Sequence, residues 1–482
     1  MTKGMQIPLV ESIQRTSLSA EEVDERLRDM ELRNDLLQYK VERWCVWPIL
    51  RFEVGCLMEN IPLTKRSNTW LIELLIPAIH GLKGLTLLKP ARIIIKTYTS
   101  GLVERKGGSY KGIWFDDLLL SIGDYVKIET INNRTFIPRR KTALTKSNLI
   151  TNLLDLVTVL LARVGGPRYI SEIARKLNTG LNNELKLNGF TLRWAKRRLR
   201  NFYWRKKIYT YLLRRVRPAY LLTADPGEHA LVAAAKEQGI KVIELQHGLI
   251  NRHHYAYSWM VDGVKDKRWM PIPDCLFLWG EYWKQELEVN GFWGNALCVV
   301  GSLRMEEYRH RKAAKKKEQV CTLVLTSQGI DVERIIVFVS NFLKASKGKH
   351  DMRLYVKLHP VYETSKTLYE AAFKDDPRVQ VLLGNEDPST FDLLTLADFH
   401  LSISSTCHYD ALGLGVPTII LPFATHENVL SLHEMGHAFL ASTPTELLDI
   451  LLRWKGREVP NEVGEFYFKT GALENMKREV MQ

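Results

Sequence analysis

The chain has 482 residues, which is too long for one ordinary hydrophobic core, so two α/β domains with an extension are expected. A hydrophobic content of 45% and a charged content of 25% exclude a disordered or collagen-like protein. The six cysteines have no C-x-x-C spacing, which favours free thiols in a reducing compartment. The N-terminus lacks the apolar core of a signal peptide and the most apolar windows contain charges, so a cytoplasmic protein is predicted.

The net charge of +14 is concentrated in residues 193–217, where eleven Lys and Arg side chains alternate with aromatic ones and no acidic residue occurs. Three interpretations are open for this stretch: an anionic membrane or a lipid-linked acceptor, a solvated basic helix that bridges parts of the fold, or nucleic acid. No nucleic-acid motif accompanies it, so nucleic acid is not predicted as a partner. We expect the stretch to dock the protein on an anionic membrane surface.

In chain order, residues 1–90 are predicted to form a helical extension. Ser19 and Glu22 form the pattern of a capping box, which opens an amphipathic helix toward Trp44. A first Rossmann-like domain is predicted over residues 91–305, with a helical insertion at about 144–213 that ends in the basic stretch.

Two polar residues follow neighbouring strands of the predicted first domain. The run 219–224 is a strand that ends at Asp225, and the run 240–245 is the next strand, followed by Gln246 and His247. Ligands of parallel sheets collect at the carboxyl ends of strands, so Asp225 and His247 are expected to share a crevice. A histidine with a pKa near the working pH suits proton abstraction. A turn-shaping Asp225 and a His247 that only caps its loop are the structural alternatives.

The second Rossmann-like domain is predicted over residues 318–455, after a charged linker. Its strands are followed by polar residues: Ser327 and Gln328, then Lys357 and His359, then Ser404, Ser405, Thr406 and Asp410. A loop of hydroxyls beside a helix start suits a phosphate, and Asp410 is placed to accept the two hydroxyls of a ribose. An ordinary strand-to-helix connection is the alternative. Residues 456–482 are predicted to form a closing helix.

Two Rossmann-like halves with these motifs resemble the GT-B glycosyltransferases of bacterial surface-polysaccharide assembly. The motifs are Gln246-His247-Gly248, Lys357-x-His359-Pro360, and Ser404-Ser405-Thr406 with Asp410-Ala-Leu-Gly-Leu-Gly-Val-Pro. The pattern is similar to that of the polysialyltransferases, the Kdo transferases and the CDP-glycerol glycerophosphotransferases. It departs from many GT-B enzymes at Asp410, where they keep a Glu. The fold class that the resemblance implies is α/β, with two Rossmann-like domains facing a cleft, a helical N-terminal extension and a helical insertion.

The resemblance also implies roles for the site residues. The nucleotide of the donor would lie in the second domain, where Lys357 and His359 would meet its phosphates together with Ser327, Gln328 and the serine loop. The first domain would bind the acceptor and supply the base. The candidates there are His247 and Asp225 for catalysis and Gln246, His253, His254 and Tyr255 for the acceptor.

The function expected from this resemblance is transfer of a sugar from a nucleotide-activated donor to a surface polysaccharide or lipid-linked glycan. The enzyme would work at the inner face of the bacterial inner membrane. No Asp-x-Asp motif for a metal on the diphosphate is present, so we expect a metal-independent reaction without a cofactor. Inverting and retaining chemistry are both open. The alternatives are a nucleotide-sugar 2-epimerase of the same fold and a non-catalytic assembly or lipid-binding subunit.

Overall fold

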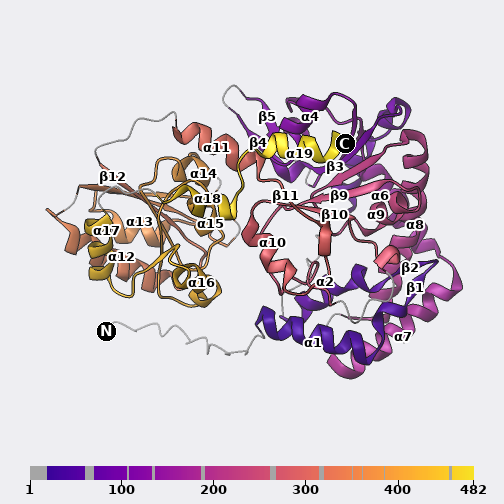
Figure 1. Cartoon of the computed structure of the whole chain (residues 1–482), viewed down its shortest axis with the longest axis horizontal. Coiled ribbons are helices and arrows are strands. Elements are labelled where there is room, and N and C mark those ends of the chain that lie inside the picture. The colour runs from indigo at the N-terminus through magenta and orange to yellow at the C-terminus, as the bar shows by residue number, and fades with distance from the viewer. Residues whose placement is uncertain are drawn as a thin grey trace, which may run out of the picture.

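The computed structural model describes residues 19–59, 70–105, 108–132, 136–185, 190–260, 267–313, 320–349, 351–360, 362–384, 386–454 and 459–481. Two α/β domains lie side by side, and the N-terminal helices pack against the first of them (Figure 1). Among the described helices, none is long and apolar enough to span a bilayer.

The N-terminal extension is a set of short helices packed against the first domain. Its capping box is confirmed, because the Ser19 hydroxyl accepts a hydrogen bond from the Glu22 amide at 3.2 Å and the Ser19 amide donates to the Glu22 carboxylate at 2.8 Å. The first helix ends at Arg33, earlier than predicted, because Asp35 turns the chain with a positive φ of 45°. The elements are α1 (Ala20–Arg33), η1 (Leu36–Gln38), β1 (Lys40–Val41), β2 (Trp44–Cys45), α2 (Trp47–Met58), α3 (Trp70–Ile79) and η2 (Lys83–Leu87).

The first domain is built on a seven-stranded sheet in the order β11-β10-β9-β8-β3-β6-β7, and all its pairings are parallel. The order reverses between β3 and β8, which makes that point the topological switch of a doubly wound sheet. The strands are β3 (Ile93–Tyr98), β6 (Tyr125–Thr130), β7 (Leu149–Ile150), β8 (Tyr220–Thr223), β9 (Lys241–Leu245), β10 (Cys275–Leu278) and β11 (Leu297–Val299). A small hairpin adds β4 (Leu102–Glu104) and β5 (Tyr110–Gly112).

The connections of the first domain are mostly helical. They are η3 (Thr99–Gly101), α4 (Asp116–Ile122), α5 (Phe136–Lys141), α6 (Asn152–Val164), α7 (Arg168–Leu185), α8 (Leu192–Val216), α9 (His229–Lys236), η4 (Lys267–Trp269), α10 (Glu281–Glu288) and η5 (Gly294–Ala296). The predicted insertion at 144–213 therefore contains edge strand β7 as well as helices α6, α7 and most of α8.

The basic stretch forms helix α8, which connects β7 to β8 through α6 and α7 and packs against α6, α7 and α9. One face of the helix is buried, including Leu199, Phe202, Tyr209 and Leu213. Lys206 is only 2% exposed and pairs with Glu42 and Glu237. Arg198, Arg205 and Lys207 also form ion pairs with acidic residues of the extension and the domain, so α8 is a packed crossover helix.

The second domain has a six-stranded sheet in the order β14-β13-β12-β15-β16-β17, again with parallel pairings. Its switch point lies between β12 and β15. The predicted linker is helical in its first part, as α11 (Leu303–Ala313). The other elements are β12 (Cys321–Thr326), α12 (Val332–Ser346), β13 (Met352–Lys357), α13 (Thr367–Phe373), β14 (Val379–Leu382), α14 (Thr390–Leu394), β15 (Phe399–Ser402), α15 (Cys407–Gly413), β16 (Thr418–Ile420), η6 (His426–Val429), α16 (Leu430–Glu434), β17 (Phe439–Leu440) and α17 (Pro444–Trp454).

After the second domain the chain returns to the first. Helix α18 (Asn461–Tyr467) packs on α10 and α15, and α19 (Ala472–Met481) packs on α4 and α11 (Figure 1). Ala472, Met476 and Val480 are buried in one core cluster with Ile93 and Phe277 of the first sheet. Two Rossmann-like sheets joined in this way confirm the predicted fold class.

Candidate functional site

A cavity of about 180 Å³ lies between the two domains. Residues at the carboxyl end of β9 form one wall and residues at the start of α15 form the opposite wall. The lining includes Gln246 and His247 from the first domain, Arg304 from α11, Phe391 from α14, Thr406 at the start of α15, and Tyr409 and Asp410 within α15. The cavity therefore joins one predicted catalytic residue to two of the predicted donor residues.

On the first wall, His247 is the second residue after β9, and the neighbouring Gln246 fixes the turn. The Gln246 side-chain amide donates to the Gly248 carbonyl at 3.0 Å and accepts from the Trp279 amide at 2.9 Å. Gln246 is 1% exposed, so its side chain holds the ends of β9 and β10 together. Its predicted contact with an acceptor stays a prediction.

Burial lowers the pKa of His247, and the charge of Asp225 opposes this shift. The imidazole is therefore neutral near pH 7 and can accept a proton. Asp225 follows β8, which pairs with β9, so the two residues leave neighbouring strands as predicted. The Asp225 carboxylate also accepts the Gly227 amide at 2.7 Å, which is the turn-shaping contact considered for it.

On the opposite wall, burial raises the pKa of Asp410 to about 6, although the charge of Arg304 opposes the rise. Arg304 lies 3.8 Å from the centre of the Phe391 ring. Its Nε is buried and has no hydrogen-bond partner among the described residues. Sequence reasoning assigned Arg304 to a linker and missed it; its position just after the strand that ends the first domain was the available signal.

The second switch point brings two predicted donor residues together. Gln328 follows β12 and Ser404 follows β15. The side-chain oxygen of Gln328 accepts a hydrogen bond from the Ser404 amide at 3.0 Å. The Ser404 hydroxyl lies 2.7 Å from that of Thr425. The Ser405 hydroxyl accepts the Cys407 amide at 3.2 Å, and Thr406 reaches the cavity lining. These hydroxyl groups occupy the edge where ligands of doubly wound sheets bind.

Ser327 and His359 lie in a second layer held by Glu363, which sequence reasoning did not single out. The Glu363 carboxylate accepts the Ser327 hydroxyl at 2.8 Å, the Tyr369 hydroxyl at 3.1 Å and the His359 amide at 2.9 Å. The His359 ring stacks on Tyr362 with centroids 4.4 Å apart. Neither Ser327 nor His359 lines the cavity between the domains.

Lys357 is 2% exposed and its ammonium group donates to the carbonyl oxygens of Glu386 and Pro388, the latter at 3.0 Å. Burial lowers its pKa. In this structure Lys357 supports the turn after β14 and does not line the cavity between the domains. Its contact with donor phosphates stays a prediction.

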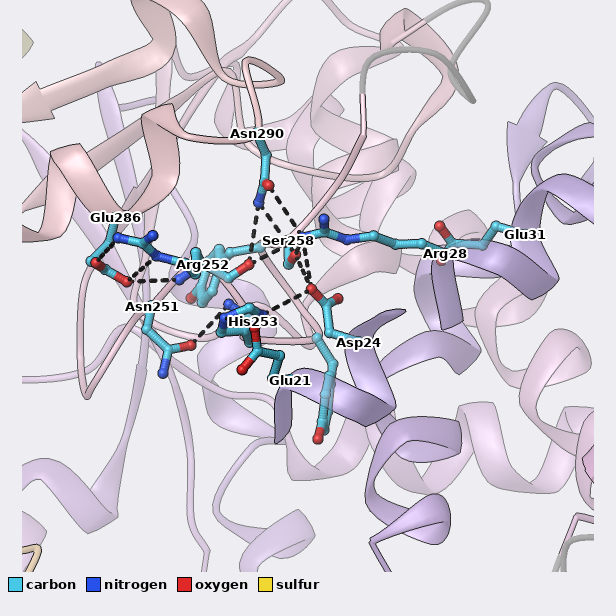
Figure 2. A network of polar contacts seen from close by, with 12 residues as sticks. Glu21, Asp24, Arg28, Glu31, Asn251, Arg252, His253, Ser258, Glu286 and Asn290 are labelled. Carbon is cyan, nitrogen blue, oxygen red and sulfur yellow. Dashed lines mark hydrogen bonds and ion pairs between the residues drawn. The ribbon is translucent and has the colours of Figure 1, made fainter. Parts of the chain in front are cut away.

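The predicted acceptor residues on the loop after His247 pack against the extension. His254 stacks on Phe52 with centroids 5.9 Å apart, and the Tyr255 ring covers Gly55, where an added Cβ would lie 2.4 Å from the ring. His253 lies 3.6 Å from Asp24 of α1, in the polar network of Figure 2. These three side chains face the extension, so their role toward an acceptor stays a prediction.

Among the described residues, no group of three or more His, Cys, Asp or Glu side chains is arranged to hold a metal ion. The six cysteines are free thiols.

No protein-family model and no curated protein matches the chain. Among solved structures it is similar to the UDP-GlcNAc 2-epimerase of Methanocaldococcus jannaschii, with 14% identity, a TM-score of 0.48, and 81% of this chain and 99% of that chain covered. It is also similar to Acinetobacter baumannii MurG (10% identity, TM-score 0.44, 81% and 99% covered). A third similar structure is the wall teichoic acid polymerase TagF soaked with CDPG (10% identity, TM-score 0.42, 85% and 96% covered). At these identities the likeness concerns the fold alone.

Proposed function

We propose that the protein is a glycosyltransferase that moves a sugar from a nucleotide-activated donor to a surface polysaccharide or lipid-linked glycan. The observation that carries the proposal is the shared cavity, in which His247 of the first domain, whose pKa is lowered, lines the same space as Arg304 of α11 and Asp410 of the second domain. Buried groups with shifted pKa values that converge on one cavity are typical of catalytic sites.

Transfer requires a bond between the acceptor oxygen and the anomeric carbon to form while the bond from that carbon to the nucleotide phosphate breaks. His247 takes the proton of the acceptor hydroxyl, and the neutral state of its imidazole makes this possible. The guanidinium of Arg304 offers hydrogen-bond donors to the negative charge that develops on the departing phosphate. The Ser404 and Thr425 hydroxyls border the nucleotide.

The acceptor is proposed to sit at an anionic membrane, and a surface outside α8 supports this. Helices α3 and α6 pack side by side, and each turns an apolar stripe outward. The exposed side chains are Leu75, Ile76, Ile79 and Leu82 from α3 and the turn after it, and Val157, Leu160 and Val164 from α6. We call these residues the apolar face.

Arginines lie next to the apolar face. Arg163 precedes the exposed Val164 at the end of α6, and its charge and that of Arg193 add to the burial that lowers the pKa of Arg197 on α8. The Nη2 of Arg197 is buried without a hydrogen-bond partner among the described residues. Apolar side chains beside cations fit the acyl region and the headgroups of an anionic bilayer.

The first experiment is a thermal-shift screen against CMP, CDP, UDP, GDP and TDP and their sugar conjugates, because a ligand that binds only the native state raises the melting temperature. We expect a shift with one nucleotide that Arg304→Ala reduces. Transfer to an acceptor extract from labelled donor should then fall by about a hundredfold or more in His247→Ala, with the melting temperature kept. Epimerised donor without glycan product would favour the 2-epimerase, and nucleotide binding without any turnover would favour the non-catalytic subunit.

A further inference from the structure

The loop after His247 is held by the N-terminal extension at several points. Figure 2 shows Asp24 and Arg28 of α1 pointing at Ser258, His253 and the backbone of Arg252. The Ser258 hydroxyl donates to Asp24 at 2.8 Å, and the Arg28 guanidinium donates to the Arg252 carbonyl at 3.3 Å. Side chains of the extension thus contact both the main chain and the side chains of the loop.

A buried ion pair organises these contacts. The side chains of Asp24 and Arg51 are fully buried and 3.1 Å apart, and Arg51 also donates to the Tyr255 carbonyl. Burial alone would raise the pKa of Asp24, but the nearby His253 ring, the hydrogen bond from Ser258 and the charges of Arg51 and Arg28 hold its pKa below the ordinary value. Asp24 is therefore charged, and it fixes the loop from the inside of the protein.

The loop returns to the strand that carries His247. The Tyr257 hydroxyl donates to the buried carboxyl group of Glu244, which is on β9 three positions before His247. The ring of His254 lies between the two sides, with its centroid 5.9 Å from Phe52 of α2 and 4.8 Å from Tyr257. The loop is therefore clamped between α2 and β9, with His254 in the middle.

From this arrangement we infer that the extension is a positioning device for His247, acting through Phe52 and the His254 loop. The inference rests on the proposed role of His247 as the base. It gives a function to residues 19–59, in which sequence reasoning found no chemistry.

The state of His254 supports the inference. Burial lowers the pKa of His254 to about 4, and the nearby charge of His247 lowers it further. The ring is therefore neutral at pH 7 and places no competing charge beside the base. The titratable and charged groups around His247 are His254 on its loop, Asp225 and Glu244 on the adjoining strands, and Arg304, Tyr409 and Asp410 across the cavity.

The test uses Phe52→Ala, because Phe52 is 44% exposed and its removal should leave the fold intact. Asp24 and Arg51 are unsuitable, since removing either leaves a buried unpaired charge. Without the ring, water reaches His254 and the loop after His247 loses its packing against α2, so the pKa of both imidazoles should rise toward the ordinary value. We expect a rise of about half a unit or more for His247 in an NMR titration, with its signals assigned from His247→Gln.

Kinetics supply the second readout. In Phe52→Ala we expect kcat to fall about tenfold with KM for the donor unchanged, and the acid limb of the kcat profile to move to higher pH. Phe52→Tyr keeps the aromatic stack on His254, so its kcat and the acid limb of its kcat profile should match those of the wild type. Arg33→Ala is the matched control, because it removes an exposed pair with Asp29 on the same extension and should change neither.

The NMR titration distinguishes a failure of the positioning role from a failure of the proposed transfer reaction. An unchanged His247 pKa in Phe52→Ala overturns the positioning role even if transfer is observed. A shifted pKa in a protein that shows no transfer with His247 intact sustains the clamp and overturns the proposed reaction.

Discussion

At the scale of single residues, the site contains two ionisable groups whose pKa values are shifted in favour of the uncharged form. His247 and Asp410 face one cavity, the first with a lowered pKa and the second with a pKa of about 6. The raised pKa of Asp410 lowers the stability of the folded state near neutral pH, because a carboxyl group removed from water resists ionisation. Gln246 uses its hydrogen bonds to hold the ends of β9 and β10 at the cavity, whereas those of Lys357 support the turn after β14, away from it.

The cost at Asp410 can be measured. Its pKa rises from 3.8 to about 6, so the folded state keeps the proton longer than the unfolded state and stability falls as pH rises between about 4 and 6. Asp410→Asn removes this cost, and at pH 7.5 we expect it to be about 2 to 3 kcal/mol more stable than the wild type, with no difference below pH 4. Urea unfolding at both pH values gives the comparison. Equal stability at pH 7.5 would contradict the raised pKa.

At the scale of elements, the basic stretch and the proposed membrane-docking surface lie on different helices. Helix α8 uses Lys206 and Arg198 for ion pairs with Glu237 and Glu53, so reversing the charge of these two residues would disturb the fold as well as any binding. The proposed docking surface is instead the apolar face of α3 and α6, whose side chains are exposed.

For the apolar face we expect Ile79→Glu and Leu160→Glu, each at a position at least 50% exposed, to fold normally. Each change should lower binding to vesicles of phosphatidylcholine with about one third phosphatidylglycerol by about 10- to 150-fold, because it removes about 1.5 to 3 kcal/mol of apolar burial. Co-sedimentation measures the binding. Val337→Glu and Leu368→Glu are equally exposed controls in the second domain and should bind as the wild type does. Equal loss in the controls, or none in the face variants, would refute this docking surface.

At the scale of the whole molecule, the chain closes by returning to its first domain. Helix α19 inserts Ala472, Met476 and Val480 into the core beneath the first sheet. The end of the chain is therefore part of the first domain's core although it follows the second domain in sequence.

Met476→Ala is expected to destabilise the first domain by about 2 to 5 kcal/mol, because it leaves a cavity in a core that cannot fully collapse. Met481→Ala, at a position 52% exposed in the same helix, should cost less than about 0.5 kcal/mol. Chemical denaturation followed by tryptophan fluorescence reports the difference. A transition of the second domain alone would contradict the assignment of α19 to the first.

The sequence by itself determined the sheet strands and the polar residues at their ends. Apolar runs bounded by Gly and Pro predict buried parallel strands, and the carboxyl ends of such strands meet at one edge. For this reason Asp225, His247 and Asp410 could be singled out from local pattern. Short edge strands such as β7 and β17 have only two residues each and carry no periodic signal, so they were missed.

Only the tertiary structure decided which polar residues face the cavity. Lys357 and Ser327 carry the right chemistry, but their side chains are occupied by carbonyl and carboxylate partners far away in sequence, which local pattern cannot reveal. Arg304 reaches the cavity because α11 runs between the domains, and its sequence context is that of a charged linker. The clamp on the loop after His247 joins residues more than 200 positions apart, since packing against a distant helix is set by the fold and by no local rule.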